Sequence, residues 1–328
     1  MTATPHASAA PPPATPARRR RWGRAAITGV VLWLIGLGVP FALDQTWVFI
    51  ASLFAVYAIV ALSQDIVLGR AGMFDMGHAV YFGVGAYVTA ILNTQFGWPI
   101  LASWPVAVIA ATLLGALLAA PIVRLRGDYL LVATIGFNAI FVLVLNNNVG
   151  GLTGGADGLF GIGAPALGNW QLASQSAMFY LNWLAFAFTL WLILNLERSH
   201  LGRTLRYLKL DELAAGTLGV NARRYRVLAF ALGAGLAGFA GTLFAALMSA
   251  VSPGAFVFTE SVTLFAIVLV GGQGSIPGVL LGTALMFVVP QVFRGFAEYR
   301  YFVFGIAMIV IMVLRPQGIW PRRGRPGP

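Results

Sequence analysis

Long apolar runs without charged residues recur along the 328-residue chain, and they limit its possible folds more than any other feature. Such a run crosses about 30 Å of hydrocarbon as a helix when it contains roughly 18–20 residues. Hydrophobic residues make up 59% of the chain and charged residues only 9%, whereas a soluble domain carries about 25% charged residues. A soluble fold could not cover so much apolar surface with polar groups. The sequence therefore predicts an all-α polytopic membrane protein.

We expect eight to ten transmembrane helices, because one of the ten apolar runs is short for a complete crossing. The short run is 259–271, which could be a half-helix or a re-entrant segment. With ten crossings and a cytoplasmic N-terminus, all basic residues except Arg294 and Arg300 fall in cytoplasmic segments. Because basic residues concentrate on the cytoplasmic side of membrane proteins, both termini are predicted to be cytoplasmic. The predicted spans are 25–43, 46–63, 77–93, 101–122, 129–146, 177–196, 227–248, 259–271, 276–293 and 301–314.

The polar segments divide the chain into two tails and a membrane domain. Residues 1–24, rich in Ala, Pro and Arg, are expected to form a disordered cytoplasmic tail, and residues 315–328 a cytoplasmic C-terminal tail. A signal peptide would also begin with a basic stretch and an apolar run, but no clear Ala-x-Ala cleavage site follows, so a retained anchor helix fits better. The transmembrane domain covers 25–314. It carries a glycine-rich outer loop at 147–176 and a cytoplasmic segment at 197–226 with an amphipathic helix at its centre.

The residue types present exclude several classes of chemistry. The chain has no cysteine and only 3 well-separated histidines, which removes disulfides, thiolate ligands and HExxH-type metal sites. It has no GxxxxGK[ST] motif, and no carboxylate pair or Ser/His/Asp set lies in the spans. We therefore predict no enzyme activity, no ATPase site, no metal and no cofactor. The net charge of +11 follows the positive-inside pattern, so membrane lipid rather than nucleic acid is the expected surrounding.

Few ionisable or strongly polar residues fall within the spans, and each is a functional candidate because such groups are costly in lipid. Asp75 and His78 are three residues apart, so on a helix they would share a face near the cytoplasmic entrance of the third span. They could form a gate or contact substrate, although a helix cap is the favoured interpretation. Asn138 could hydrogen-bond a passing solute, but a bond to a neighbouring helix is favoured. Glu260 is expected at the membrane interface rather than buried.

The acidic residues lie in loops or near span ends, so energy for transport is expected to come from another subunit. The cytoplasmic segment contains Asp211–Gly219, which resembles the coupling loop of bacterial ABC importer permeases. Ala214, Ala215 and Gly219 match the spacing of that loop, whereas the acidic Glu212 comes one position early. Small alanines would let the helix fit a groove of a partner, and the glycine would allow a tight turn. An ordinary interfacial helix is the alternative.

The resemblance extends to one family over roughly residues 60–320. The matching motifs are GHAVYFGVGAY at 77–87, RLRGDYL at 124–130, LTGG at 152–155, GGQGSIPG at 271–278 and RPQG at 315–318. They are similar to segments of the LivM-type permeases of the branched-chain (hydrophobic) amino-acid ABC importer family. The long N-terminal tail rich in Pro and Arg is not part of this shared pattern.

The resemblance implies a transport subunit of the bacterial inner membrane. It would form the translocation pore with a second homologous permease, above two cytoplasmic ABC ATPases that hydrolyse ATP. A periplasmic substrate-binding protein would deliver the amino acid to the outer loop, and Asp211, Glu212, Ala214, Ala215 and Gly219 would contact an ATPase. Two alternatives remain: a permease of the same family for an amide or urea, and an autonomous secondary carrier. The missing mid-membrane carboxylates weigh against the carrier.

Overall fold

The computed structural model describes residues 36–125, 127–167, 170–172 and 174–288, together with Gly305, Ile309 and residues 318–320. Both predicted tails lie outside these residues, except for 318–320, and so do residues 25–35 of the first predicted span and almost all of the last one. Within the described part, six helices are long and apolar enough to cross a membrane, and two shorter apolar helices accompany them. The all-α membrane fold is confirmed, while the total of ten spans and the cytoplasmic termini stay predictions.

The helices lie close to the predicted spans, because uncharged apolar segments satisfy their backbone hydrogen bonds only within themselves. The short turn α2 (Val39–Ala42) comes first. The long helices are α3 (Gln45–Asp65), continued by the π-helical turn η1 (Ile66–Arg70), α5 (Ile100–Ile122), α6 (Asp128–Asn146), α7 (Gln175–Arg198) and α10 (Ala222–Met248). The shorter helices are α4 (Ala79–Thr94), α11 (Phe258–Gly271) and α12 (Ile276–Thr283), with the π-helical turn η4 (Ala284–Val288).

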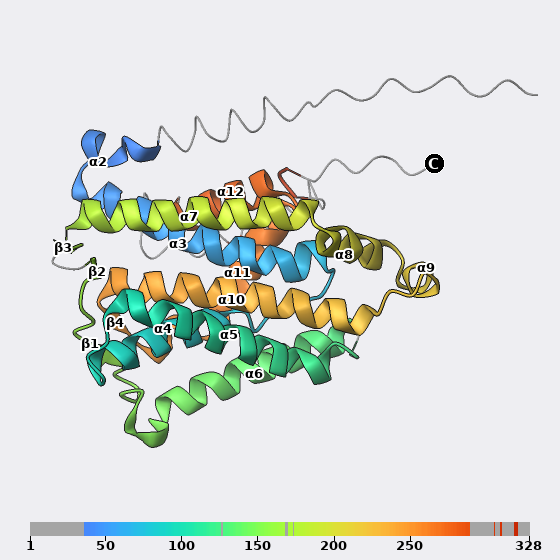
Figure 1. Ribbon diagram of the computed structural model, residues 1–328, viewed down its shortest axis with the longest axis horizontal. Coiled ribbons are helices and arrows are strands. Elements are labelled where there is room, and N and C mark those ends of the chain that lie inside the picture. The colour runs from blue at the N-terminus through green and yellow to red at the C-terminus, as the bar shows by residue number, and fades with distance from the viewer. Residues whose placement is uncertain are drawn as a thin grey trace, which may run out of the picture.

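Helices α3 and α10 form the centre of the bundle. The most apolar 18-residue window of each is 72% and 67% buried, compared with 28% for α5 and 22% for α6. In Figure 1, α10 lies between α3 on one side and α4 and α5 on the other, and α7 runs along α3. The outward faces of α5 and α6 carry large exposed apolar side chains: Ile109, Leu113, Leu117, Val132, Ile140 and Leu143. These faces suit lipid or another membrane subunit.

The two ends of the bundle differ in structure and charge. Two small antiparallel sheets lie at one end, formed by β1 (Leu159–Phe160) with β4 (Ala250–Val251) and β2 (Ala166–Leu167) with β3 (Trp170–Gln171). The opposite end carries α8 (His200–Leu210) and α9 (Glu212–Thr217), which project from the bundle (Figure 1).

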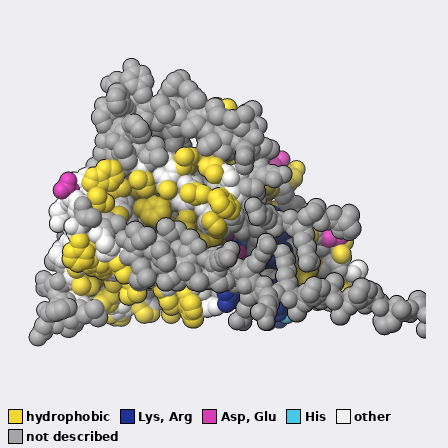
Figure 2. Space-filling model, turned by 90° about the horizontal axis from the view of Figure 1, so that it is seen from above, with side chains coloured by type: hydrophobic (Ala, Val, Ile, Leu, Met, Phe, Trp, Pro, Cys, Tyr) yellow, Lys and Arg dark blue, Asp and Glu magenta, His cyan; other side chains and the backbone are white. Residues whose placement is uncertain are grey.

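Basic residues mark the end that carries α8 and α9. Figure 2 shows apolar side chains over much of the described part of one face, with Lys and Arg side chains toward the α8–α9 end. By the positive-inside rule we expect this end to be cytoplasmic and the strand end to be outer, and we name the two ends accordingly.

Helices α4 and α11 both begin inside the bundle. Helix α11 has 14 residues, a length of about 21 Å at 1.5 Å per residue, which is less than a complete crossing. The short run predicted at 259–271 is thus α11, and together with the preceding 3₁₀ turn η3 (Pro253–Phe256) it makes up the sixth long apolar segment, Pro253–Gly271. A hydrogen bond joins the N-terminal ends of α4 and α11: the backbone N–H of Ala79 donates to the hydroxyl of Ser261 at 3.1 Å.

Candidate functional site

The main candidate site is the α8–α9 hook, defined as residues 199–221, at the cytoplasmic end. Ser199 begins α8, and its hydroxyl accepts a hydrogen bond from the backbone N–H of Gly202. One face of α8 is apolar and packs on the bundle through Leu205 and Leu208, both buried. Its exposed face carries Arg203, Arg206 and Lys209, which explains why α8 lies across the bundle end instead of entering the membrane.

Helix α9 is a short helix with well-defined ends. The Asp211 carboxylate accepts hydrogen bonds from the N–H groups of Leu213 and Ala214 at 2.9 and 3.0 Å, so Asp211 is its N-cap. At the other end, the N–H of Val220 donates to the carbonyl of Ala215 at 3.2 Å. Gly219 closes this turn with a φ of +80°, a conformation that favours glycine. The glycine in the motif is thus required by the backbone.

Two polar anchors hold the hook against the bundle. The Lys209 ammonium donates to the carbonyl of Gly69 at 2.7 Å and to the Gln273 side chain at 3.3 Å. Glu212 forms an ion pair with Arg226 of α10 at 2.9 Å. The hook therefore contacts the end of α3, the turn between α11 and α12, and the start of α10.

The structure gives the predicted coupling residues different positions. Asp211 caps α9, Glu212 bonds to Arg226, and Gly219 forms the terminal turn. Ala214 is exposed, whereas Ala215 is only 4% exposed and faces the bundle. A bulky residue at Ala215 would therefore disturb the hook itself before it disturbed a partner.

Three exposed leucines on the hook were missed by the sequence analysis. Leu210, Leu213 and Leu218 are 78%, 81% and 85% exposed, although they lie beyond the end of the membrane bundle. Exposed apolar groups gathered in this way mark a contact surface for another protein. The signal in the sequence was three leucines among the charged and small residues of 210–218.

Asp75 and His78 meet in a turn before α4, so the predicted shared helix face is wrong. Both side chains are fully buried, and His78 Nδ1 lies 3.0 Å from Asp75 Oδ2. His78 Nε2 lies 2.8 Å from the Ser63 hydroxyl, whose own hydrogen points to the carbonyl of Val60. Both ring nitrogens of His78 therefore have a hydrogen-bond partner inside the bundle. His78 is at the N-cap of α4 but makes no side-chain cap bond there; a gate role stays a prediction.

Asn138 connects helix α6 to the irregular segment before α11. Its side-chain N–H donates to the carbonyl of Phe256 at 3.2 Å, and the side chain is 1% exposed. This contact fits the favoured interpretation of a bond between elements. Glu260, expected at the interface, instead lies in the first turn of α11 with its Oε1 shielded from solvent, so that expectation is wrong.

A charged cluster at the cytoplasmic end also escaped the sequence analysis. Asp65 is fully buried and accepts a hydrogen bond from the N–H of Gly274 at 2.7 Å and one from Arg70 Nε at 3.3 Å. Arg70 Nη1 lies 3.4 Å from Glu197 at the end of α7. This cluster could have been suspected from the sequence, because Asp65 and Arg70 are oppositely charged and lie five residues apart at the end of a predicted span.

Comparison with known proteins identifies the family. The family described as branched-chain amino acid transport system, permease component, matches residues 46–312. The chain is 36% identical over 315 residues to the high-affinity branched-chain amino acid transport system permease protein LivM of Escherichia coli strain K12, covering 89% of this chain and 74% of that protein. It is 27% identical over 287 residues to LivH of the same strain, covering 81% of this chain and 91% of LivH.

A third relative is the high-affinity branched-chain amino acid transport system permease protein BraD of Pseudomonas aeruginosa, 27% identical over 289 residues, covering 81% of this chain and 92% of BraD. No solved structure matches the chain. The family match and the six long apolar helices agree on a multi-pass protein of the bacterial inner membrane. The chain belongs to the family of permease components of branched-chain amino acid transport systems.

Proposed function

We propose that this chain and a second, homologous permease subunit form the translocation pore of an ATP-driven ABC importer for branched-chain or other neutral amino acids. Two separate cytoplasmic ATPases hydrolyse the ATP, and a periplasmic binding protein delivers the amino acid at the outer end. The chain itself needs no cofactor in this scheme. The names of its relatives, LivM, LivH and BraD, support the branched-chain class of substrate.

The exposed leucines of the hook carry this proposal. Leu213 and Leu218 lie in and just after α9, beyond the apolar bundle, where lipid tails do not cover them. An apolar groove on an ATPase would remove these side chains from water, which favours docking by about 25 cal/mol for each Å² of apolar surface buried. Ala214, exposed beside them, leaves room for close approach.

The anchors of the hook explain how force would reach the membrane helices. A movement of α9 pulls on α10 through the Glu212–Arg226 ion pair. A movement of α8 acts on η1 and on the α11–α12 turn through Lys209. Both routes lead to helices near the bundle centre, so a rigid displacement of the hook is transmitted instead of being absorbed in a loop.

Replacement of Leu213 by Glu tests the docking surface. Leu213 is exposed, so Leu213→Glu should leave folding intact while placing a charge in the apolar contact. We expect the ATPases to be lost on purification and ATP-driven leucine uptake to fall at least tenfold. Leu213→Met is the matched control, because it keeps the apolar surface and should retain both activities. Normal uptake and ATPase recovery with Leu213→Glu would reject this surface.

The same purified complex separates the alternatives. Competition of leucine uptake by isoleucine and valine, but not by an amide or urea, supports the amino-acid importer. Stronger transport of an amide or urea would support the other permease class. Uptake that persists without ATP and without ATPase subunits would support an autonomous carrier.

A further inference from the structure

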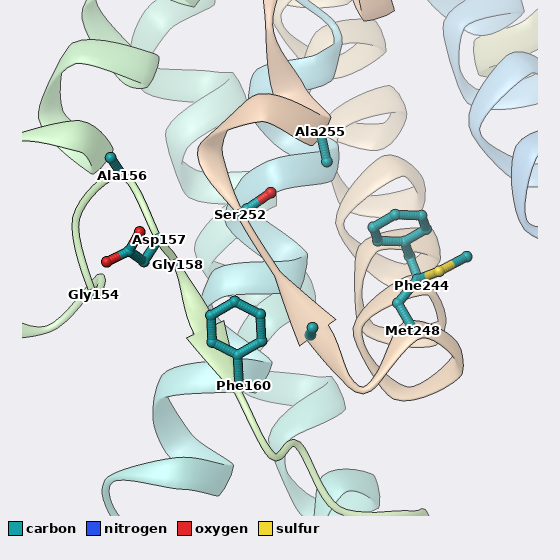
Figure 3. Close-up of a pocket in the computed structure, with 10 residues that line it drawn as sticks. Gly154, Ala156, Asp157, Gly158, Phe160, Phe244, Met248, Ser252 and Ala255 are labelled. Atoms are coloured by element: carbon teal, nitrogen blue, oxygen red, sulfur yellow. The ribbon is translucent and has the colours of Figure 1, made fainter.

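A pocket of about 970 Å³ lies at the outer end, between the glycine-rich loop and the end of α10. We call it the outer pocket. Figure 3 shows Asp157 and Phe160 on one side and Phe244 and Met248 on the other, with Ser252 between the two walls. Its volume lies within the range of about 300–1,000 Å³ that is usual for small-molecule sites.

The walls of the outer pocket are brought together by the sheet of β1 and β4. Leu159 pairs with Val251 and Phe160 with Ala250, which joins the loop after α6 to the segment after α10. Gly158 fits because its φ is +83° and because a side chain there would overlap the carbonyl of Val251. The pocket is therefore built by paired backbone and is more than a gap between loops.

The chemistry of the lining is mostly apolar, with one charged group. Asp157 is the only ionisable residue among the side chains that line the outer pocket in the described part. It is exposed, so its carboxylate meets solvent at the outer side. Phe244 and Met248 offer an apolar wall opposite, and the Ser252 hydroxyl is a hydrogen-bond donor and acceptor. A ligand with a cationic group and an apolar side chain suits this lining.

The Phe244 wall of the outer pocket is backed by a cluster of buried aromatic rings, which we call the aromatic floor. Phe244 packs edge-on against Phe82 of α4 and Phe256 of η3, with ring centroids 5.2 and 6.0 Å apart. Phe82 and Phe256 also contact each other at 5.4 Å. Beneath them, Asn138 holds the carbonyl of Phe256. Phe82 and Phe256 thus support Phe244 on the side away from the pocket.

We propose that the outer pocket receives a neutral amino acid with an aliphatic side chain, whose ammonium group binds Asp157 and whose side chain packs against Phe244 and Met248. This assignment rests on the proposed function and adds a specific site to it. The aromatic floor holds the amino acid at the outer side until α4 and α10 move apart. Because Asp157 is exposed, its ion pair is weak, which suits a site that must release its ligand.

Equilibrium binding of radiolabelled leucine to the purified importer complex, without the binding protein, tests the site. The wild-type complex should show saturable binding that alanine displaces poorly and that 4-methylpentanoate, which lacks the ammonium group, does not displace. Asp157→Asn should weaken leucine binding about threefold to fivefold. Asp44→Asn is the matched control, because Asp44 is also acidic, exposed and at the outer end but does not line the pocket.

A second pair of variants tests the apolar wall. Met248→Ser should reduce the preference for leucine over alanine, whereas Met248→Leu should keep it. No saturable leucine binding to the wild-type complex, or unchanged binding in both Asp157→Asn and Met248→Ser, would overturn the assignment. It would also be overturned if Asp157→Asn impaired capture of the binding protein but left leucine binding unchanged. ATP-driven uptake by the wild-type complex separates this result from a failure of the proposed function, which predicts that uptake.

Discussion

Asp65 illustrates how a single buried charge organises the cytoplasmic end. Its two carboxylate oxygens bind Arg70 and the backbone N–H of Gly274, which lies 209 residues further along the chain. Gly69 leaves room for this carboxylate, because a side chain at Gly69 would overlap it. Asp65 thereby connects the end of α3 to the turn before α12. Such an arrangement is stable only while every charged partner is present.

Replacement of Asp65 by Ala should destabilise the protein strongly. The change removes one of the two carboxylates that pair with the buried Arg70. Loss of one partner of a buried ion pair lowers the free energy of unfolding by about 3–5 kcal/mol. The fraction of monodisperse protein in detergent after heating measures the effect. Asp128→Ala is the control, since Asp128 is exposed in the first turn of α6 and should cost at most about 1 kcal/mol. Equal thermal stability of the two variants would contradict this role of Asp65.

The approach of helices α4 and α10 depends on glycine at the contact. A methyl group at Gly85 would overlap the carbonyl oxygen of Gly238, and one at Gly241 would overlap the carbonyl oxygen of Phe82. Without side chains, the two backbones pack directly against each other, as is common between membrane helices. These small residues therefore serve helix packing, and they set the position of the aromatic floor through Phe82.

Two glycine substitutions distinguish packing from helix propensity. Gly85→Ala should lower stability by about 1–3 kcal/mol, because the added methyl group forces α4 away from α10. Gly136→Ala in α6 should be neutral or stabilising by up to about 1 kcal/mol, since no atom lies within 4 Å of the added group. Thermal denaturation in detergent measures both. If the Gly85→Ala protein were as stable as the Gly136→Ala protein, close packing of α4 against α10 at Gly85 would not be needed for stability.

The whole molecule has an outer end with small sheets and a pocket, and a cytoplasmic end with a projecting hook (Figure 1). Helices α4 and α11 meet between these ends, where Ser261 binds the first N–H of α4. Helix starts inside a membrane bundle are tolerated where protein surrounds them. Such broken helices are a common feature of transporters with central substrate sites. In the proposed importer, the outer end would receive the amino acid and the cytoplasmic end would accept force from the ATPases.

Purification in mild detergent from native membranes tests this organisation at the scale of the complex. Mass spectrometry should identify a second permease of the same family and two P-loop ATPases with the tagged chain. The exposed apolar faces of α5 and α6 offer a surface for the second permease within the membrane. The exposed leucines of the hook offer a surface for the ATPases on the cytoplasmic side. Recovery of the chain alone, in a preparation that takes up amino acids without ATP, would overturn the importer assignment.

The sequence by itself determined the helices. The predicted spans 101–122 and 129–146 differ by one residue from α5 and α6, because the length of an uncharged apolar run reflects the thickness of the bilayer. The family motifs could also be recognised, since they are short stretches of contiguous sequence. These features need no knowledge of which helices are neighbours.

Only the tertiary structure decided which side chains meet. It joined His78 to Ser63 as well as to Asp75, turned Ala215 inward but left Ala214 exposed, and brought Asp157 opposite Met248. Each of these outcomes depends on the rotation of a helix about its axis and on contacts between distant segments. Apolar residues surround most of these helices, so their sequence pattern does not indicate which face turns inward. Close packing selects that face, and with it the hook surface and the outer pocket.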